Sequence, residues 1–115
     1  MVKLKEKESD IQRTILVHLA TMGIFHYRNN SGAMVSEYKG KKRFMRFGAV
    51  GSPDIVIVSK GIYIGVEVKG TDGKQTENQI AFQLELQNAG GKYILVHSFE
   101  EFVEKYAELI SPKTP

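Results

Sequence analysis

Two neighbouring segments of the chain carry acidic and basic side chains at spacings suited to phosphate chemistry. Asp54 begins the apolar run DIVIV, and Glu67 and Lys69 lie two residues apart in YIGVEVK. Two carboxylates, with water and carbonyl oxygens, suit a hard ion such as Mg²⁺, which prefers substrate phosphates as its remaining ligands. A lysine beside them can orient or help deprotonate an attacking water and offset the carboxylate charge. These residues can therefore form a site for metal-assisted phosphate hydrolysis.

The segments that carry these residues are predicted to be adjacent strands. Residues 54–59, DIVIVS, form a β-branched run of the kind buried on both faces of a sheet, and 59–61, SKG, form a tight reversal. In the strand that follows, alternation places Glu67 and Lys69 on one face. Because paired strands lie about 4.8 Å apart, Asp54 and Glu67 can approach one cation.

A surface ion pair is the alternative interpretation of the same residues, since strand-end acids often pair with a lysine. One detail argues against it. Glu67 and Lys69 interrupt an otherwise apolar strand and are flanked by Val66 and Val68. Charged side chains within an apolar strand usually have a charged or hydrogen-bonding partner or a functional role.

A basic and aromatic segment, YKGKKRFMRF at 38–47, contains no acid. Its cations are Lys39, Lys41, Lys42, Arg43 and Arg46. Together with the preceding AMVSEY, it is predicted to form a hairpin that turns at Gly40. The cations can meet phosphates, and the interleaved rings can stack on bases. A solvated hairpin whose rings face the core fits the pattern equally well.

The remaining periodicity predicts helices and strands around this pair. Helices are expected at 8–22, 76–89 and 98–110, and further strands at 24–28, 33–38, 42–47 and 92–97. The second helix carries an apolar stripe through Ile80, Ala81 and Leu84, which Phe82 and Leu86 widen. The order predicts an α/β (α+β) fold in which helices flank a mixed central sheet, within a single domain covering 1–115.

Composition excludes several classes of site. Of the 115 residues, 42% are hydrophobic and 25% charged, as in soluble globular domains. The lack of cysteine excludes disulfides, thiolate zinc sites and cysteine nucleophiles. His18, His26 and His97 lack metal-ligand spacing and are interpreted as packing or surface residues. No apolar run approaches the roughly 20 residues that span a bilayer, and no secretion signal is present, so we expect a cytoplasmic protein without a membrane partner.

Several motifs in sequence order resemble a known nuclease family. SPDIVIV followed by YIGVEVKG is similar to the Pro-Asp, then acid-any-Lys signature of the PD-(D/E)XK nuclease superfamily. A first helix bearing a Glu, a RNNSGA-like turn, RFGAVGSPDI, VEVKG and a helix opening with Gln together resemble the virus-type replication-repair nuclease domain, VRR-NUC. The resemblance covers nearly the whole chain. It implies a restriction-endonuclease-like core and an endonuclease that depends on Mg²⁺ or Mn²⁺.

The same resemblance implies roles for individual residues. Asp54 and Glu67 would bind the metal with help from the backbone carbonyl of Val68. Lys69 would serve the nucleophilic water. Glu8 matches the acid of the family's first helix and would complete the catalytic and metal-binding set.

Glu8 and a further matched residue, Gln79, also have local interpretations. Ser9 and Gln12 have capping-box spacing, which predicts that Glu8 lies just outside the first helix and only favours its dipole. Gln79 matches the glutamine on the helix after the family's lysine strand. Because Thr76 and Gln79 have the same capping-box spacing, this side chain alternatively only reaches back to a backbone amide.

The resemblance to small stand-alone members implies a substrate of branched or otherwise structured DNA. Asn30, Ser31 and Gly32, with Arg46, match positions expected near substrate. We favour four-way (Holliday) junctions, because cutting both strands of a symmetric junction suits a homodimer with two active sites. The alternatives are a non-catalytic nucleic-acid-binding module on the same fold and a structural subunit whose hairpin binds protein.

Overall fold

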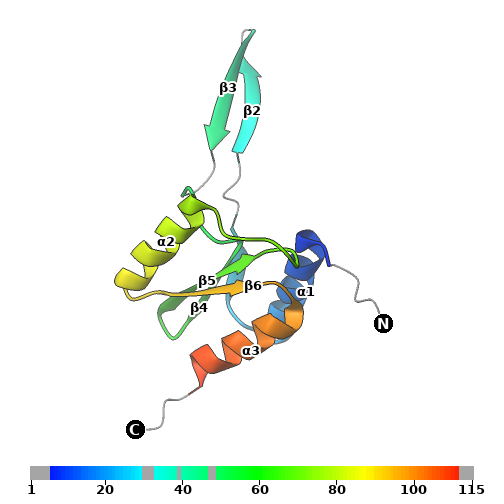
Figure 1. The fold of residues 1–115 in the computed structure, drawn as a ribbon, viewed down its shortest axis with the longest axis vertical. Coiled ribbons are helices and arrows are strands. Elements are labelled where there is room, and N and C mark those ends of the chain that lie inside the picture. The colour runs from blue at the N-terminus through cyan, green and yellow to red at the C-terminus, as the bar shows by residue number, and fades with distance from the viewer. Residues whose placement is uncertain (1–5, 30–32, 39, 47–48, 112–115) are drawn as a thin grey trace.

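The computed structural model of the protein describes residues 6–29, 33–38, 40–46 and 49–111, with backbone alone for 33–38 and 41–46 (Figure 1). Its helices are α1 (Glu8–Thr21), α2 (Glu77–Asn88) and α3 (Phe99–Ile110). Its strands are β1 (His26–Arg28), β2 (Ala33–Tyr38), β3 (Lys41–Arg46), β4 (Ile55–Ser59), β5 (Ile62–Val68) and β6 (Lys92–Val96).

Four of the strands form a mixed sheet in the order β1-β4-β5-β6. The β1–β4 and β4–β5 pairs are antiparallel, whereas β5 and β6 run parallel. The reversal between β4 and β5 is a tight turn in which Lys60 and Gly61 both have positive φ, of 50° and 80°. The predicted mixed sheet flanked by helices is confirmed, with α1 and α3 on one face and α2 on the other (Figure 1).

The main core lies between the sheet and the α1–α3 pair. In α1, the inward side chains Ile11, Ile15 and Leu19 follow helical spacing and are fully buried. Phe102 and Tyr106 of α3 join them. Alternate residues of β4, β5 and β6 complete the cluster: Ile55, Ile57, Ile64, Val66, Val68, Ile94 and Val96. Side chains at the positions between these therefore face α2.

The apolar stripe predicted on α2 is only partly turned towards the sheet. Ile80 and Leu84 are 44% and 57% exposed, and Ala81 is exposed as well. The half-buried positions are instead Gln79, Phe82, Gln83 and Leu86, at helical spacing. Two of these are polar because the sheet face beneath α2 holds polar side chains that need hydrogen bonds. The helix is thus confirmed, and of the residues in its predicted stripe Phe82 and Leu86 are half-buried whereas Ile80, Ala81 and Leu84 are exposed.

Strands β2 and β3 pair only with each other in the part of the chain that is described. Their register joins Ala33 to Arg46 and Tyr38 to Lys41. The resulting ribbon extends away from the four-stranded sheet (Figure 1). No helix in the described ranges is long and apolar enough to cross a membrane.

Candidate active site

Asp54 and Glu67 lie opposite each other where β4 begins and β5 ends. The β4–β5 register pairs Ile55 with Val66, so the next antiparallel step brings Asp54 beside Glu67. Asp54 Oδ2 accepts a hydrogen bond of 2.8 Å from the backbone N–H of Val68. This bond fixes the Asp54 carboxylate against the strand that carries Glu67.

Asn29, which sequence reasoning missed, holds the segment that leads into Asp54. Its Nδ2 donates to Ser52 Oγ at 2.8 Å and to the Pro53 carbonyl at 2.9 Å. Its backbone N–H donates to the Asp54 carbonyl at 2.8 Å. The only signal in the sequence was an asparagine after a short strand. Its partners lie more than 20 residues away and could not be assigned locally.

Glu67 is 1% exposed, although it is an acid in a β-strand. Its Oε1 accepts a hydrogen bond of 3.0 Å from Gln79 Nε2. Its Oε2 is buried and accepts no hydrogen bond from a donor among the described residues. A side-chain hydrogen bond between Glu67 and Asp54 requires a proton on one of the two acids. Burial raises the pKa of Glu67 to about 9; the Asp54 carboxylate adds to the increase, Lys69 opposes it and Glu8 adds slightly. A buried carboxylate beside a second carboxylate ionises readily only when a positive charge joins the pair.

The acid pair therefore fits a divalent cation. A buried carboxylate oxygen without a donor gains a partner when a hard ion binds, and that ion neutralises the repulsion between Asp54 and Glu67. Within the described ranges, no group of three or more His, Cys, Asp or Glu side chains is arranged to hold a metal. Two carboxylates suit Mg²⁺, which usually keeps several waters and binds protein through one or two acids. The donor chemistry thus matches Mg²⁺ or Mn²⁺.

Gln79 forms the capping box that the sequence offered as its local interpretation, and it also contacts Glu67. Its side-chain Oε1 accepts a hydrogen bond from the backbone N–H of Thr76 at 2.8 Å, and its backbone N–H donates to Thr76 Oγ1 at 3.2 Å. This is a complete capping box at the start of α2. Because Nε2 remains available, the same side chain donates to Glu67. The cap holds the amide in the orientation that Glu67 requires.

Glu8 is the first residue of α1, where the helix was expected to begin, and the capping-box alternative that places it outside the helix is wrong. Lys7 is the N-cap and makes no side-chain capping bond, which leaves the Ser9–Gln12 capping box unformed. The start of α1 lies beside the end of β5, because a Cβ at Gly70 would be 3.7 Å from the Glu6 carbonyl oxygen. Glu8 therefore belongs to the electrostatic surroundings of the acid pair.

Lys69 follows β5 directly and is half-buried. Its backbone N–H donates to the Val96 carbonyl at 2.9 Å, which extends the β5–β6 pairing by one residue. Its ammonium opposes the increase in the pKa of Glu67 that burial and Asp54 produce. A cation close to the acids is the arrangement that a lysine assisting a nucleophilic water requires.

The predicted nucleic-acid-binding residues are not brought to the acid pair by the described structure. Asn30, Ser31 and Lys39 lie outside the described residues. The backbone positions of Lys41, Lys42, Arg43 and Arg46 lie along β3 in the projecting ribbon. Alternation along the strand distributes these four positions over both faces of the ribbon.

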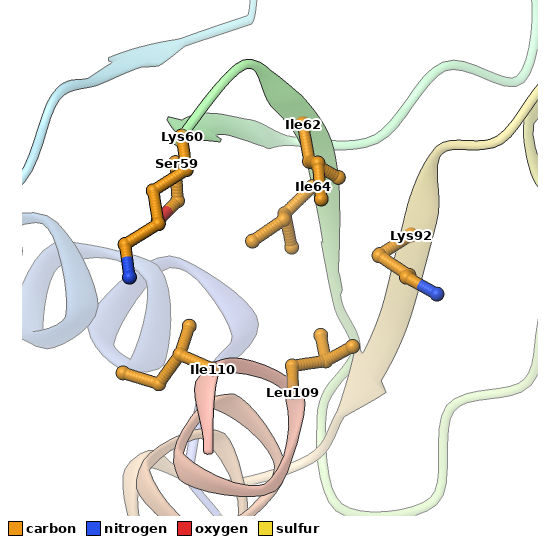
Figure 2. A pocket seen from close by; sticks show the side chains of 7 residues that line it. All are labelled: Ser59, Lys60, Ile62, Ile64, Lys92, Leu109 and Ile110. Carbon is orange, nitrogen blue, oxygen red and sulfur yellow. The ribbon is translucent and has the colours of Figure 1, made fainter. Parts of the chain in front are cut away.

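A pocket of about 260 Å³ lies at the other end of the sheet (Figure 2). Figure 2 shows Ile62 and Ile64 of β5 facing Leu109 and Ile110 at the end of α3. The pocket is also lined by Ser59, Lys60 and Lys92. Because no acid lines this pocket, it lacks the chemistry of a divalent-metal site. The acid pair at the opposite end remains the candidate active site.

No protein-family model matches the chain, and no curated protein matches it significantly.

Proposed function

We propose that this chain is a divalent-metal-dependent endonuclease that hydrolyses phosphodiester bonds in structured DNA. The observation that carries the proposal is the buried Glu67 carboxylate beside Asp54, with one oxygen lacking any hydrogen-bond donor among the described residues. An arrangement so costly in free energy is characteristic of functional sites. SPDIVIV and YIGVEVKG resemble the PD-(D/E)XK signature, and the chain resembles VRR-NUC domains. This resemblance supports a nuclease function for the acid pair.

Each residue of the site has a distinct role in this proposal. Asp54 and Glu67 hold Mg²⁺ or Mn²⁺, and the Val68 carbonyl is a further candidate donor. A bound divalent ion supplies stabilisation of the negative charge that develops on the phosphate. The Lys69 ammonium orients the attacking water and favours loss of its proton to solvent by stabilising the hydroxide that forms. Gln79 keeps the Glu67 carboxylate in place through its 3.0 Å hydrogen bond.

The proposed substrate is branched DNA, with a four-way junction as the favoured form. A domain of 115 residues has little room for base-reading elements, so recognition would depend on backbone charge and shape. The cations of β3 supply positive charge on a projecting ribbon. Cutting both strands of a junction suits a homodimer. A sample that sediments as a monomer while it cuts junctions at full rate contradicts the dimer.

A cleavage assay tests the function directly. Junction, flap and linear DNA are incubated with the protein and either Mg²⁺ or Mn²⁺. We expect Asp54→Asn and Lys69→Met each to lower the cleavage rate by about 100-fold or more, because the first weakens binding of the metal and the second removes the cation beside the attacking water. Glu100→Gln, which neutralises an exposed acid on α3, is the matched control and should cut like wild type.

The outcomes separate the proposal from its alternatives. Variants at Asp54 and Lys69 that cut as well as wild type contradict the assigned site. A wild-type protein that binds DNA but cuts none of the substrates with either metal is the non-catalytic module. Absence of DNA binding even at low salt favours a structural subunit whose hairpin binds protein.

A further inference from the structure

The loop between β5 and α2, residues 69–76, connects Lys69 to the start of the helix that carries Gln79. It begins with Lys69 and ends at Thr76, the N-cap of α2. A tight turn within it is closed by a 2.8 Å hydrogen bond from the Gly73 N–H to the Gly70 carbonyl. This turn packs directly on Lys69, because a Cβ at Gly73 would be 2.9 Å from Lys69 Cβ. Gly73 therefore lies against the first carbon of the Lys69 side chain.

His97 directly follows β6, and its ring contacts this turn. Its Nε2 lies 2.9 Å from the Gly73 carbonyl oxygen, across 24 residues of sequence. With a proton on Nε2, the ring donates to that carbonyl. The ring is half-buried between the loop and the first turn of α3.

Glu101 and Lys105 hold the His97 ring in this orientation. Glu101 Oε1 lies 3.4 Å from His97 Nδ1 and accepts from the His97 backbone N–H at 3.2 Å. Lys105 Nζ lies 3.3 Å from the same oxygen and donates to the Leu95 carbonyl at 2.7 Å. Burial alone would raise the pKa of Glu101, but the hydrogen bonds from Lys105 and His97 lower it, so the carboxylate remains an acceptor.

Capping of α3 does not account for the contact between His97 and the loop. Ser98 is the N-cap, and its Oγ accepts from the Glu101 N–H at 3.0 Å. The helix start is therefore satisfied without the imidazole ring. What the ring adds is a bond to the turn that packs on Lys69.

We propose that His97 is a positioning residue for Lys69: through the Gly73 carbonyl it holds the 70–73 turn against the Lys69 side chain, while Glu101 orients its ring. The inference rests on the proposed nuclease function. Lys69 acts only if its ammonium reaches the attacking water, and a small displacement of a catalytic group costs a large factor in rate. Loss of the His97–Gly73 bond should therefore lower kcat and leave DNA binding unchanged.

Two substitutions at this position separate the two ring nitrogens. In His97→Gln, the side-chain amide extends to about the position of Nε2 and can still donate to Gly73. In His97→Asn, the shorter amide reaches only the position of Nδ1, so it can no longer donate to Gly73. His26→Asn is the matched control, because the His26 ring bonds to the nearby Ile24 carbonyl and lies outside the site.

Steady-state cleavage and amide hydrogen exchange are measured for all four proteins. We expect His97→Asn to lower kcat about tenfold with KM for DNA within about twofold of wild type, and His97→Gln to keep kcat within about threefold. Exchange at residues 70–75 should be about tenfold faster in His97→Asn alone. His26→Asn should match wild type in both measurements.

A His97→Asn variant that keeps the wild-type kcat overturns the inference, as does an equal loss in the Asn and Gln variants. If wild type cuts no DNA with either metal, the nuclease proposal itself fails. Hydrogen exchange then decides alone whether His97 holds the loop: faster exchange in His97→Asn supports the attachment, and unchanged exchange refutes it.

Discussion

Glu67 lies in an environment that opposes its own ionisation. It is buried under α2, it faces Asp54, and the single amide of Gln79 is the hydrogen-bond donor that reaches its carboxylate among the described residues. Its pKa is raised to about 9, mainly by burial and secondly by the charge of Asp54. The free energy of this arrangement depends on the protons or cations that accompany the pair, which leads to two predictions at the scale of single residues.

Without metal, stability should fall as pH rises between about 4.5 and 9. The pKa of Glu67 is raised from its ordinary value of 4.5 to about 9, so the folded state binds more protons than the unfolded state in this interval. The free energy of unfolding then falls by up to about 1.4 kcal/mol per pH unit. Glu67→Gln should remove this slope, as measured by urea unfolding in EDTA.

Addition of Mg²⁺ gives the complementary measurement. Because the ion binds the ionised pair, it should raise the melting temperature of wild type more at pH 8 than at pH 6, and leave Glu67→Gln nearly unchanged. A wild-type protein with no pH slope in EDTA would show that Glu67 is ionised at neutral pH without a metal.

The two functions of Gln79 can be separated by comparing it with its capping partner. Thr76→Ala removes the acceptor for the Gln79 N–H, which should cost about 1 kcal/mol of stability and leave cleavage intact. Gln79→Met should cost a similar amount and also lower the cleavage rate about tenfold, because Glu67 Oε1 loses its donor. Denaturation curves and initial cleavage rates measure both effects; equal cleavage by the two variants would assign Gln79 to capping alone.

At the scale of elements, the site depends on the close approach of β5 to the segment before β4. Gly65 lies across from Val56, and it leaves room for Pro53, the residue before Asp54. A side chain at Gly65 would meet Pro53 Cγ at 2.7 Å and Leu86 Cδ2 of α2 at 3.5 Å. The glycine therefore sets how closely the proline segment and α2 pack on the strand that carries Glu67.

Gly65→Ala should lower the free energy of unfolding by about 1–3 kcal/mol, because the core has no room for a methyl group there. Gly70→Ala is the matched control, since its Cβ would lie at an ordinary 3.7 Å from the Glu6 carbonyl oxygen. That variant should change stability by less than about 0.5 kcal/mol. Denaturant midpoints compare the two, and equal midpoints would contradict the close approach at Gly65.

At the scale of the whole molecule, the protein consists of a layered body and a projecting ribbon. The β2–β3 ribbon carries four cations on β3, and its strands pair only with each other among the described residues (Figure 1). The acid pair lies in the body, between the four-stranded sheet and α2. This separation predicts that binding and stability respond to different substitutions.

Changing the four cations of β3 to glutamine should weaken DNA binding and leave stability nearly unchanged. Removing each cation that neutralises a phosphate should reduce the slope of log K against log salt by about 1. The melting temperature should stay close to that of wild type, because the ribbon does not extend the central sheet. Binding titrations at several salt concentrations measure the slope, and an unchanged slope would show that the ribbon does not contact phosphate.

Local sequence was sufficient to place the acid pair on adjacent strands. Alternation in YIGVEVK assigns Glu67 to the face opposite Val66 and Val68, and the Lys60–Gly61 turn brings Asp54 alongside. Helical spacing likewise places Ile11, Ile15 and Leu19 on one side of α1, and this side is buried. These predictions depend on the period of each element and on a short turn, which neighbouring residues determine.

Contacts between distant segments were decided only by the tertiary structure. The bonds from Asn29 to the Pro53 segment and from His97 to Gly73 join residues more than 20 positions apart. The buried side of α2 depended on the polar groups beneath it, so Ile80 and Leu84 are exposed although their spacing is helical. Periodicity shows which side chains share a face, but packing determines what that face meets, and the free energy of burying Glu67 depends on that packing.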